Sequence, residues 1–185
     1  MPRRLAVIAP YVVKILDYEE PPLQPHQVRV KTELASAKHG TNIGMFEGKN
    51  FEGYTFDPEW HIFRSQPETA TQLYPRGMYG VMGVGLVTEI GPEVTRWQVG
   101  DRVFGEMDVR ETNVCREDRL WALGTINPEL ALLVEPAYVA FHSVRESNVR
   151  FGDSVAVIGL GAIGLLAVRM ARLSGAENVF AIDPL

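Results

Sequence analysis

The chain has 185 residues, of which 46% are hydrophobic and 22% are charged, and its net charge is −5. This composition is ordinary for a globular protein, and the net negative charge argues against a surface for nucleic acid or anionic membranes. A single cysteine excludes an internal disulfide framework, and from the residue pattern we expect neither a signal peptide nor a membrane span. We therefore expect a cytoplasmic protein that has neither nucleic acid nor a membrane as a partner.

The first half of the chain is patterned as a β-rich domain. β-Branched runs are closed by Pro21 and Pro22, which cannot continue a central strand. The stretch "QVRVKTEL" alternates apolar and charged residues, which is typical of a half-buried strand. The predicted strands cover residues 4–9, 11–19, 27–34, 84–91 and 101–107.

Residues 50–78 interrupt this pattern. They contain three prolines and six aromatic residues but little periodicity. The aromatic side chains need something to pack on, so the segment is predicted to be an ordered loop excursion and not a disordered one.

Helical signals begin at Asn127. Asn127 is suited to the N-cap position, Pro128 to the first helical position and Glu129 to the positive first turn. Apolar residues then recur at helical spacing through "PAYVAFHSVRES", and this helix is expected to lie against a sheet. We place the domain boundary here, with one domain at residues 1–136 and a second at 137–185.

A glycine-rich motif follows an apolar strand near the end of the chain. The stretch "SVAVIG" leads into Gly159, Gly161 and Gly164 in a G-x-G-x-x-G pattern, and a helix opens at once. The first glycine permits a tight turn, the second lets a pyrophosphate approach the backbone, and the third lets helix and strand pack closely. The alternative is that the glycines serve packing alone.

A second strand, "NVFAID", ends in Asp183, 19 positions after Gly164. This spacing matches the carboxylate that hydrogen-bonds the adenosine ribose, and an acidic residue there favours NAD over NADP because it repels a 2′-phosphate. NAD is the expected cofactor, with NADP as the alternative. The predicted cofactor-binding residues are Gly159, Leu160, Gly161, Ala162, Ile163, Gly164 and Asp183.

Four stretches occur in a family-specific order: "VRVKTELASAKHGTNIGMFEG", "GVMGVGLVTEIGPEVTRWQVGDRVFG", "LLVEPAYVAFHSV" and "VAVIGLGAIGLLAVRMARLSGA". With them the chain resembles the medium-chain dehydrogenases/reductases, in particular the zinc-type alcohol and polyol dehydrogenases. The resemblance implies an α/β protein in which a β-rich GroES-like catalytic domain precedes the first β-α-β unit of a doubly wound parallel Rossmann sheet. It implies an NAD(P)-dependent oxidoreductase, a homo-oligomer, that acts on an alcohol, polyol or sugar-like substrate.

The zinc ligands of that family are incomplete in this sequence. The family's ligand positions align with His39, Val81 and Glu135, and valine cannot bind zinc, whereas a catalytic zinc needs three protein ligands. We therefore expect a zinc-independent enzyme. Alternatives are a zinc site of His39, Glu135 and a ligand from the excursion such as His61, or a non-catalytic nucleotide-binding or assembly module. Glu135 is otherwise suited to the first turn of the long helix.

The resemblance also assigns the proton transfer. Thr41 aligns with the family's proton-relay hydroxyl, and His39, two residues away, has a side chain suited to a proton shuttle. Alternatively, Thr41 is the N-cap of a helix that begins at "NIGMFEG", and His39 is a loop residue bonded to the backbone. Aromatic residues of the excursion either wall the substrate cleft or pack on the barrel: Phe51, Tyr54, Phe56, Trp60 and Phe63.

Residues 153–183 form one strand–helix–strand unit, whereas a dinucleotide fold needs two halves. We therefore expect the chain to be a truncated piece of a longer dehydrogenase. Alone, it should bind NAD weakly at best and transfer no hydride.

Overall fold

The computed structural model describes residues 1–37, 39–48, 54–65, 74–78 and 80–184. Backbone alone is described for seven of these: His39, Thr41, Tyr54, Thr55, Phe56, Phe63 and Ser65. The chain divides into two compact units, Met1–Leu132 and Leu133–Leu185. No helix in the described ranges combines the length and apolar character needed to cross a bilayer.

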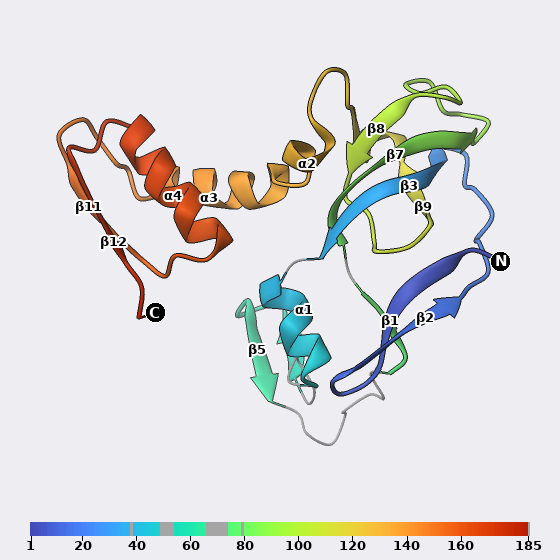
Figure 1. Cartoon of the computed structure of the whole chain (residues 1–185), viewed down its shortest axis with the longest axis horizontal. Helices are drawn as coiled ribbons and strands as arrows, with labels where there is room; N and C mark the ends of the chain where they lie inside the picture. Colours follow the sequence, from blue (N-terminus) through green and yellow to red (C-terminus); the bar gives the residue numbers. More distant parts are fainter. Residues whose placement is uncertain (38, 49–53, 66–73, 79, 185) are drawn as a thin grey trace. The chain divides into compact units, whose positions relative to one another are not determined.

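The first unit is β-rich, as predicted, and its described residues include two short α-helices and one turn of 3₁₀-helix, Glu117–Arg119 (Figure 1). Its elements in chain order are β1 (Arg3–Ala9), β2 (Val12–Asp17), β3 (Gln27–Ala37), α1 (His39–Phe46), β4 (Tyr54–Asp57), β5 (Ile62–Ser65), β6 (Arg76–Gly77), β7 (Gly80–Ile90), β8 (Arg102–Gly105), β9 (Thr112–Arg116), β10 (Leu120–Ala122) and α2 (Pro128–Ala131).

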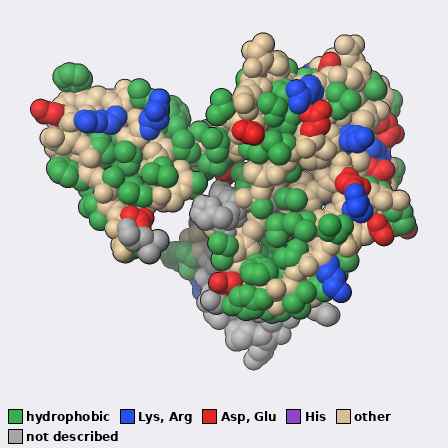
Figure 2. Space-filling model, in the orientation of Figure 1, with side chains coloured by type: hydrophobic (Ala, Val, Ile, Leu, Met, Phe, Trp, Pro, Cys, Tyr) green, Lys and Arg blue, Asp and Glu red, His purple; other side chains and the backbone are tan. Residues whose placement is uncertain are grey.

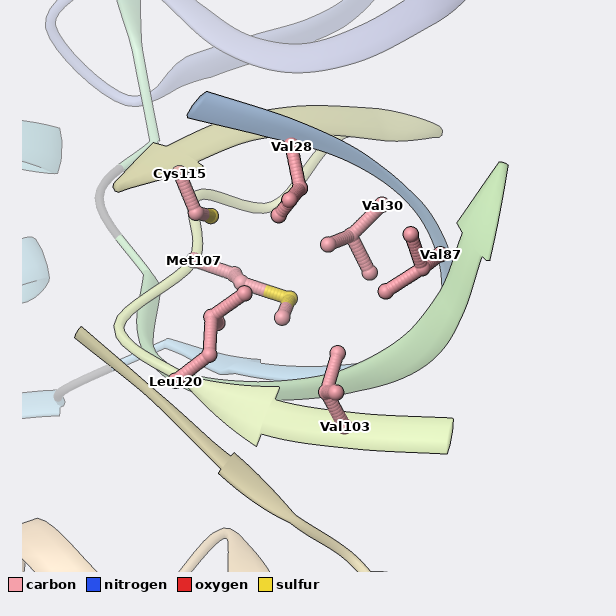
Figure 3. Packing of buried hydrophobic residues seen from close by; sticks show 7 residues of the cluster. All are labelled: Val28, Val30, Val87, Val103, Met107, Cys115 and Leu120. Carbon is pink, nitrogen blue, oxygen red and sulfur yellow. The ribbon is translucent and has the colours of Figure 1, made fainter. Parts of the chain in front are cut away.

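A strongly curved five-stranded antiparallel sheet, in the order β10-β8-β7-β3-β9, forms the main body of this unit. Alternate residues of its strands point to the inner side of the curve, where they pack into one apolar cluster (Figure 3). The cluster consists of Val28, Val30, Val87, Val103, Met107, Cys115 and Leu120. The predicted alternation in "QVRVKTEL" is thus the inward and outward alternation of β3.

A smaller sheet, in the order β2-β1-β6, is joined to the main sheet through residues 109–111. The N–H of Leu5 donates to the carbonyl of Val109 (3.1 Å), and the N–H of Glu111 donates to the carbonyl of Arg3 (2.9 Å). Glu111 in turn accepts from the N–H of Thr32 on β3 (2.9 Å). Strands far apart in the sequence therefore meet along this short segment.

The excursion at residues 50–78 contains strands, so the prediction of a loop was wrong for part of it. β4 and β5 form an antiparallel hairpin in which Asp57 pairs with Ile62. The Asp57 carboxylate accepts from the N–H of Glu59 (3.0 Å) and of Trp60 (3.1 Å), which closes the turn. The Asp57 side chain is therefore the local signal for this turn.

The second unit contains α3 (Val134–Glu146), β11 (Ser154–Ile158), α4 (Ala162–Leu173) and β12 (Asn178–Ile182). β11 and β12 pair in parallel, with Val155 opposite Val179, and α4 connects them. Ala140 and Val144 of α3 pack with Ala167 of α4, and Val157 of β11 lies against this cluster. The predicted β-α-β unit is therefore present.

One face of this parallel sheet is exposed among the described residues. Ile158 is 81% and Phe180 57% exposed, and hydrophobic side chains are visible on the surface of this unit (Figure 2).

Upstream of the unit, the predicted N-cap is confirmed, because the Asn127 side chain accepts from the N–H of Glu129 (2.7 Å).

Candidate nucleotide and catalytic site

The glycine motif forms a tight turn between β11 and α4. Gly159 has a φ of +89°, a left-handed conformation that glycine adopts without steric cost. A Cβ at Gly164 would lie 1.8 Å from the Gly159 carbonyl oxygen, so only glycine allows the helix to start so close to the strand. The first and third glycines thus have the structural roles that the spacing predicts.

The N-terminus of α4, which follows this loop directly, has no side-chain cap. Gly161 is the N-cap residue, and the first turn of the helix carries no acidic residue. The N–H groups of a first helical turn have no acceptor inside the helix and carry partial positive charge. Such an end suits the phosphates of a nucleotide, and the residues present therefore fit a dinucleotide.

Asp183 lies beside the same loop, directly after β12. Its Oδ2 accepts a hydrogen bond from the N–H of Leu160 (2.6 Å), the residue between the first two glycines. The bond fixes a half-buried carboxylate next to the turn. Sequence reasoning placed Asp183 at the end of the second strand but did not foresee this contact.

The predicted catalytic residues His39 and Thr41 lie on α1 in the first unit, and their side chains are outside the described part of the structure. The helix begins at His39, so Thr41 is its third residue and the N-cap interpretation of Thr41 was wrong. The loop interpretation of His39 was wrong for the same reason.

Two tyrosines hold the C-terminal end of α1. The N–H of Tyr11 donates to the Phe46 carbonyl (2.6 Å), and the two rings meet edge to face with centroids 5.4 Å apart. The Tyr74 hydroxyl donates to the Met45 carbonyl (2.8 Å). These bonds satisfy carbonyls that have no partner within a helix. The sequence carried one weak signal for this contact, the proline before Tyr11 in a turn between two predicted strands.

Val81, the position aligned with the missing zinc ligand, and its neighbour Met82 lie in an apolar environment. Met82 is 4% exposed and belongs to a buried cluster with Phe104 and Leu123, and Val81 packs against that cluster. Neither side chain offers the nitrogen, oxygen or thiolate donor that zinc prefers.

The other metal candidates lie on separate elements. Glu135 is in the first turn of α3, in the second unit, where the alternative interpretation placed it. His61 is an exposed residue in the β4–β5 turn, with a φ of +51°. Within the described ranges, which exclude the His39 side chain, no three His, Cys, Asp or Glu residues are grouped to hold a metal ion.

The excursion aromatics are described only in part. Phe51 lies outside the described residues, and Tyr54, Phe56 and Phe63 are described as backbone alone. Trp60 is 64% exposed on the hairpin turn. Their proposed place in a substrate cleft stays a prediction.

The alcohol dehydrogenase GroES-like domain matches residues 24–144 of the chain. The chain belongs to the alcohol dehydrogenase family that has this GroES-like domain. Over 190 residues it is 33% identical to D-guloside 3-dehydrogenase of Escherichia coli, covering 99% of this chain and 54% of the relative. It is 27% identical over 199 residues to (R,R)-butanediol dehydrogenase of Bacillus subtilis, covering 92% of this chain and 55% of the relative.

This alcohol dehydrogenase family member also has the fold of solved dehydrogenase structures. Alcohol dehydrogenase from Thermus sp. ATN1 superposes with a TM-score of 0.76 at 22% identity, covering 99% of this chain and 58% of that one. The chain spans about half the length of the curated relatives it matches. The predicted family and fold class are confirmed.

Proposed function

We propose that the protein is an NAD-dependent oxidoreductase that transfers hydride between the nicotinamide and an alcohol, polyol or sugar-like substrate. In this assignment residues 1–136 form the catalytic domain and residues 137–185 begin the nucleotide-binding domain. The observation that carries the proposal is the glycine turn of the second unit, which is bonded to the Asp183 carboxylate through Leu160.

The cofactor is bound by the loop and the helix that follows it. NAD, when bound, supplies the hydride acceptor. The backbone around Gly159 and Gly161 and the N-terminus of α4 would hold the pyrophosphate, and Asp183 would accept hydrogen bonds from the adenosine ribose. A negative charge at Asp183 supports NAD over NADP, because a 2′-phosphate would be repelled there.

Proton transfer is assigned to α1. Thr41 would donate a hydrogen bond to the substrate oxygen, polarise it, and exchange its proton as the C–O bond order changes. His39 would carry the proton onward, since an imidazole can both accept and donate a proton. The tyrosine contacts at Phe46 and Met45 support this assignment because they fix the helix that carries both residues.

Zinc independence is supported by the apolar surroundings of Val81 and Met82. Hydrogen bonds from α1 would then replace metal polarisation of the substrate. We expect less than one equivalent of zinc per chain after purification, and activity that survives chelators. A stoichiometric zinc that is lost in His39→Ala would contradict this and favour the zinc-dependent alternative.

The substrate class follows the similarity to D-guloside 3-dehydrogenase and (R,R)-butanediol dehydrogenase. The test is to measure NAD and NADP reduction by the protein that carries this chain, across a panel of glycosides, polyols and simple alcohols. Thr41→Val should abolish turnover while NAD affinity is retained, and Gly161→Trp should abolish NAD binding itself. Binding of neither cofactor, or turnover unchanged in Thr41→Val, would refute the assignment.

Cytoplasmic location and a homo-oligomeric state stay predictions of the same proposal. Cell fractionation and sedimentation of the purified protein test them directly.

A further inference from the structure

An open pocket of about 360 Å³ lies in the first unit, where β1 and β3 are joined through residues 109–111. Five charged residues line it: Arg3, Arg4, Glu33, Arg110 and Glu111. Three of the five are arginines, so the lining has an excess of positive charge. None of the residues assigned to cofactor or proton transfer is among them.

Both carboxylates of this lining are already paired. Glu111 accepts from the Arg3 backbone N–H (2.9 Å) and from the Arg3 guanidinium (2.5 and 2.8 Å). Glu33 accepts two hydrogen bonds from the Arg102 guanidinium (2.6 and 2.9 Å). Neither carboxylate is therefore available to neutralise the remaining two arginines.

The remaining arginines are neighbours across the backbone. Arg4 and Arg110 are directly opposite in an antiparallel bridge, which places their side chains on the same face. Like charges in that arrangement repel. The Arg110 guanidinium also lies over the Tyr18 ring, 5.7 Å from its centroid, and beside the Asp108 carboxylate, so this repulsion is offset only in part.

Arg110 and Arg4 differ in their hydrogen-bond partners. The Arg110 Nε donates to the Asn113 Oδ1 (2.9 Å), and its Nη2 lies 3.7 Å from the Asp108 carboxylate. The Arg4 Nε is shielded from solvent and has no hydrogen-bond partner among the described residues. A shielded donor that lacks an acceptor is unfavourable, and more so when it is charged.

We propose that this pocket binds a small oxyanion, the phosphate or carboxylate group of a small molecule, between the Arg4 and Arg110 guanidinium groups. The planar guanidinium matches two oxygens of such a group, and an anion there would offset the repulsion between the two arginines. The Thr32 hydroxyl, also in the lining, accepts from the Asn113 side chain (3.0 Å) and keeps its own proton to donate. The site is independent of the function proposed above.

The test is to titrate inorganic phosphate and malonate, each against sodium chloride at matched ionic strength, into the isotope-labelled 185-residue chain. We expect saturable changes in the amide resonances of Arg4, Thr32 and Arg110. The anion that saturates at lower concentration identifies the chemical class. Absence of a saturable change with either anion would overturn the proposal, and this wild-type result requires no variant to fold.

Variants then locate the site. Arg4→Gln and Arg110→Gln should each weaken binding about tenfold or more, since each removes a charge-assisted contact. Arg116→Gln is the matched control, because Arg116 is exposed, pairs with Asp118 and does not line the pocket. If the affinity for the anion is unchanged in Arg4→Gln, or is weakened equally in Arg116→Gln, then the net charge of the chain and not the pocket determines binding. Either result would overturn the proposal.

Discussion

Replacing Gly164 with alanine tests the geometry of the glycine turn. The new Cβ would lie 1.8 Å from the Gly159 carbonyl oxygen, whereas ordinary contact begins at 3.4 Å. The obstructing atom belongs to the backbone, so the start of α4 and the end of β11 would have to separate by about 1.6 Å, the difference between these two distances. We expect a loss of about 3 kcal/mol, the upper end of the overpacking range, which is about a hundredfold in the unfolding equilibrium of this unit.

The location of the tryptophans makes the measurement specific. All three, Trp60, Trp97 and Trp121, lie in the first unit, so their fluorescence follows that unit, while far-ultraviolet circular dichroism also follows the second. In urea, Gly164→Ala should shift the dichroism transition to lower concentration and leave the fluorescence transition in place. Gly40→Ala is the control, because no atom lies within 4 Å of its new Cβ. A dichroism transition unchanged in Gly164→Ala would refute the reasoning.

Three further predictions concern single carboxyl and thiol groups. Asp183→Ser should shift the ratio of NAD to NADP affinity toward NADP by about tenfold through the loss of charge repulsion; parallel titrations that give an unchanged ratio would contradict this. The backbone N–H groups of Thr95 and Arg96 that bind the Glu117 carboxylate hold its pKa below the usual value. The folded state therefore gains stability from this carboxylate above the pKa of the unfolded chain, and loses it as pH falls through the pKa of the folded protein. In Glu117→Gln this contribution should disappear from the pH dependence of urea unfolding. Burial raises the pKa of the Cys115 thiol to about 11, so native protein at pH 8 should resist a thiol reagent that labels it fully in urea; rapid native labelling would contradict the buried assignment.

The fold could be predicted where a residue pattern is local and periodic. The alternation in β3 and the capping at Asn127 depend on neighbours within a few positions, and so does the spacing of Gly159 and Gly164. The strands β4 and β5 were missed because each has only 4 residues, too few to establish a periodic pattern, and because the Asp57 carboxylate that closes their turn acts through local bonds.

The candidate site was predictable to a lesser extent, because its contacts join distant segments. The spacing placed Asp183 after the second strand, but its bond to Leu160 also depends on how the turn between β11 and α4 folds toward β12. The start of α1 was misplaced because Thr41 is a favourable N-cap type, whereas the structure begins the helix at His39, three residues before Asn42. The tyrosine contacts on α1 bring together residues from three separate segments and have no local pattern.

The junction of β1 with residues 109–111 also constrains the order of events during synthesis. Arg3 pairs with Glu111, 108 positions later, and Leu5 accepts from Met78 and donates to Val109. At about 10 residues per second the ribosome needs on the order of ten seconds to deliver those partners. The apolar residues Leu5, Ala6 and Val7 leave the exit tunnel before these partners have been synthesised. During that interval the nascent strand offers an unpaired edge to other chains, and a holding chaperone would find its binding segment there.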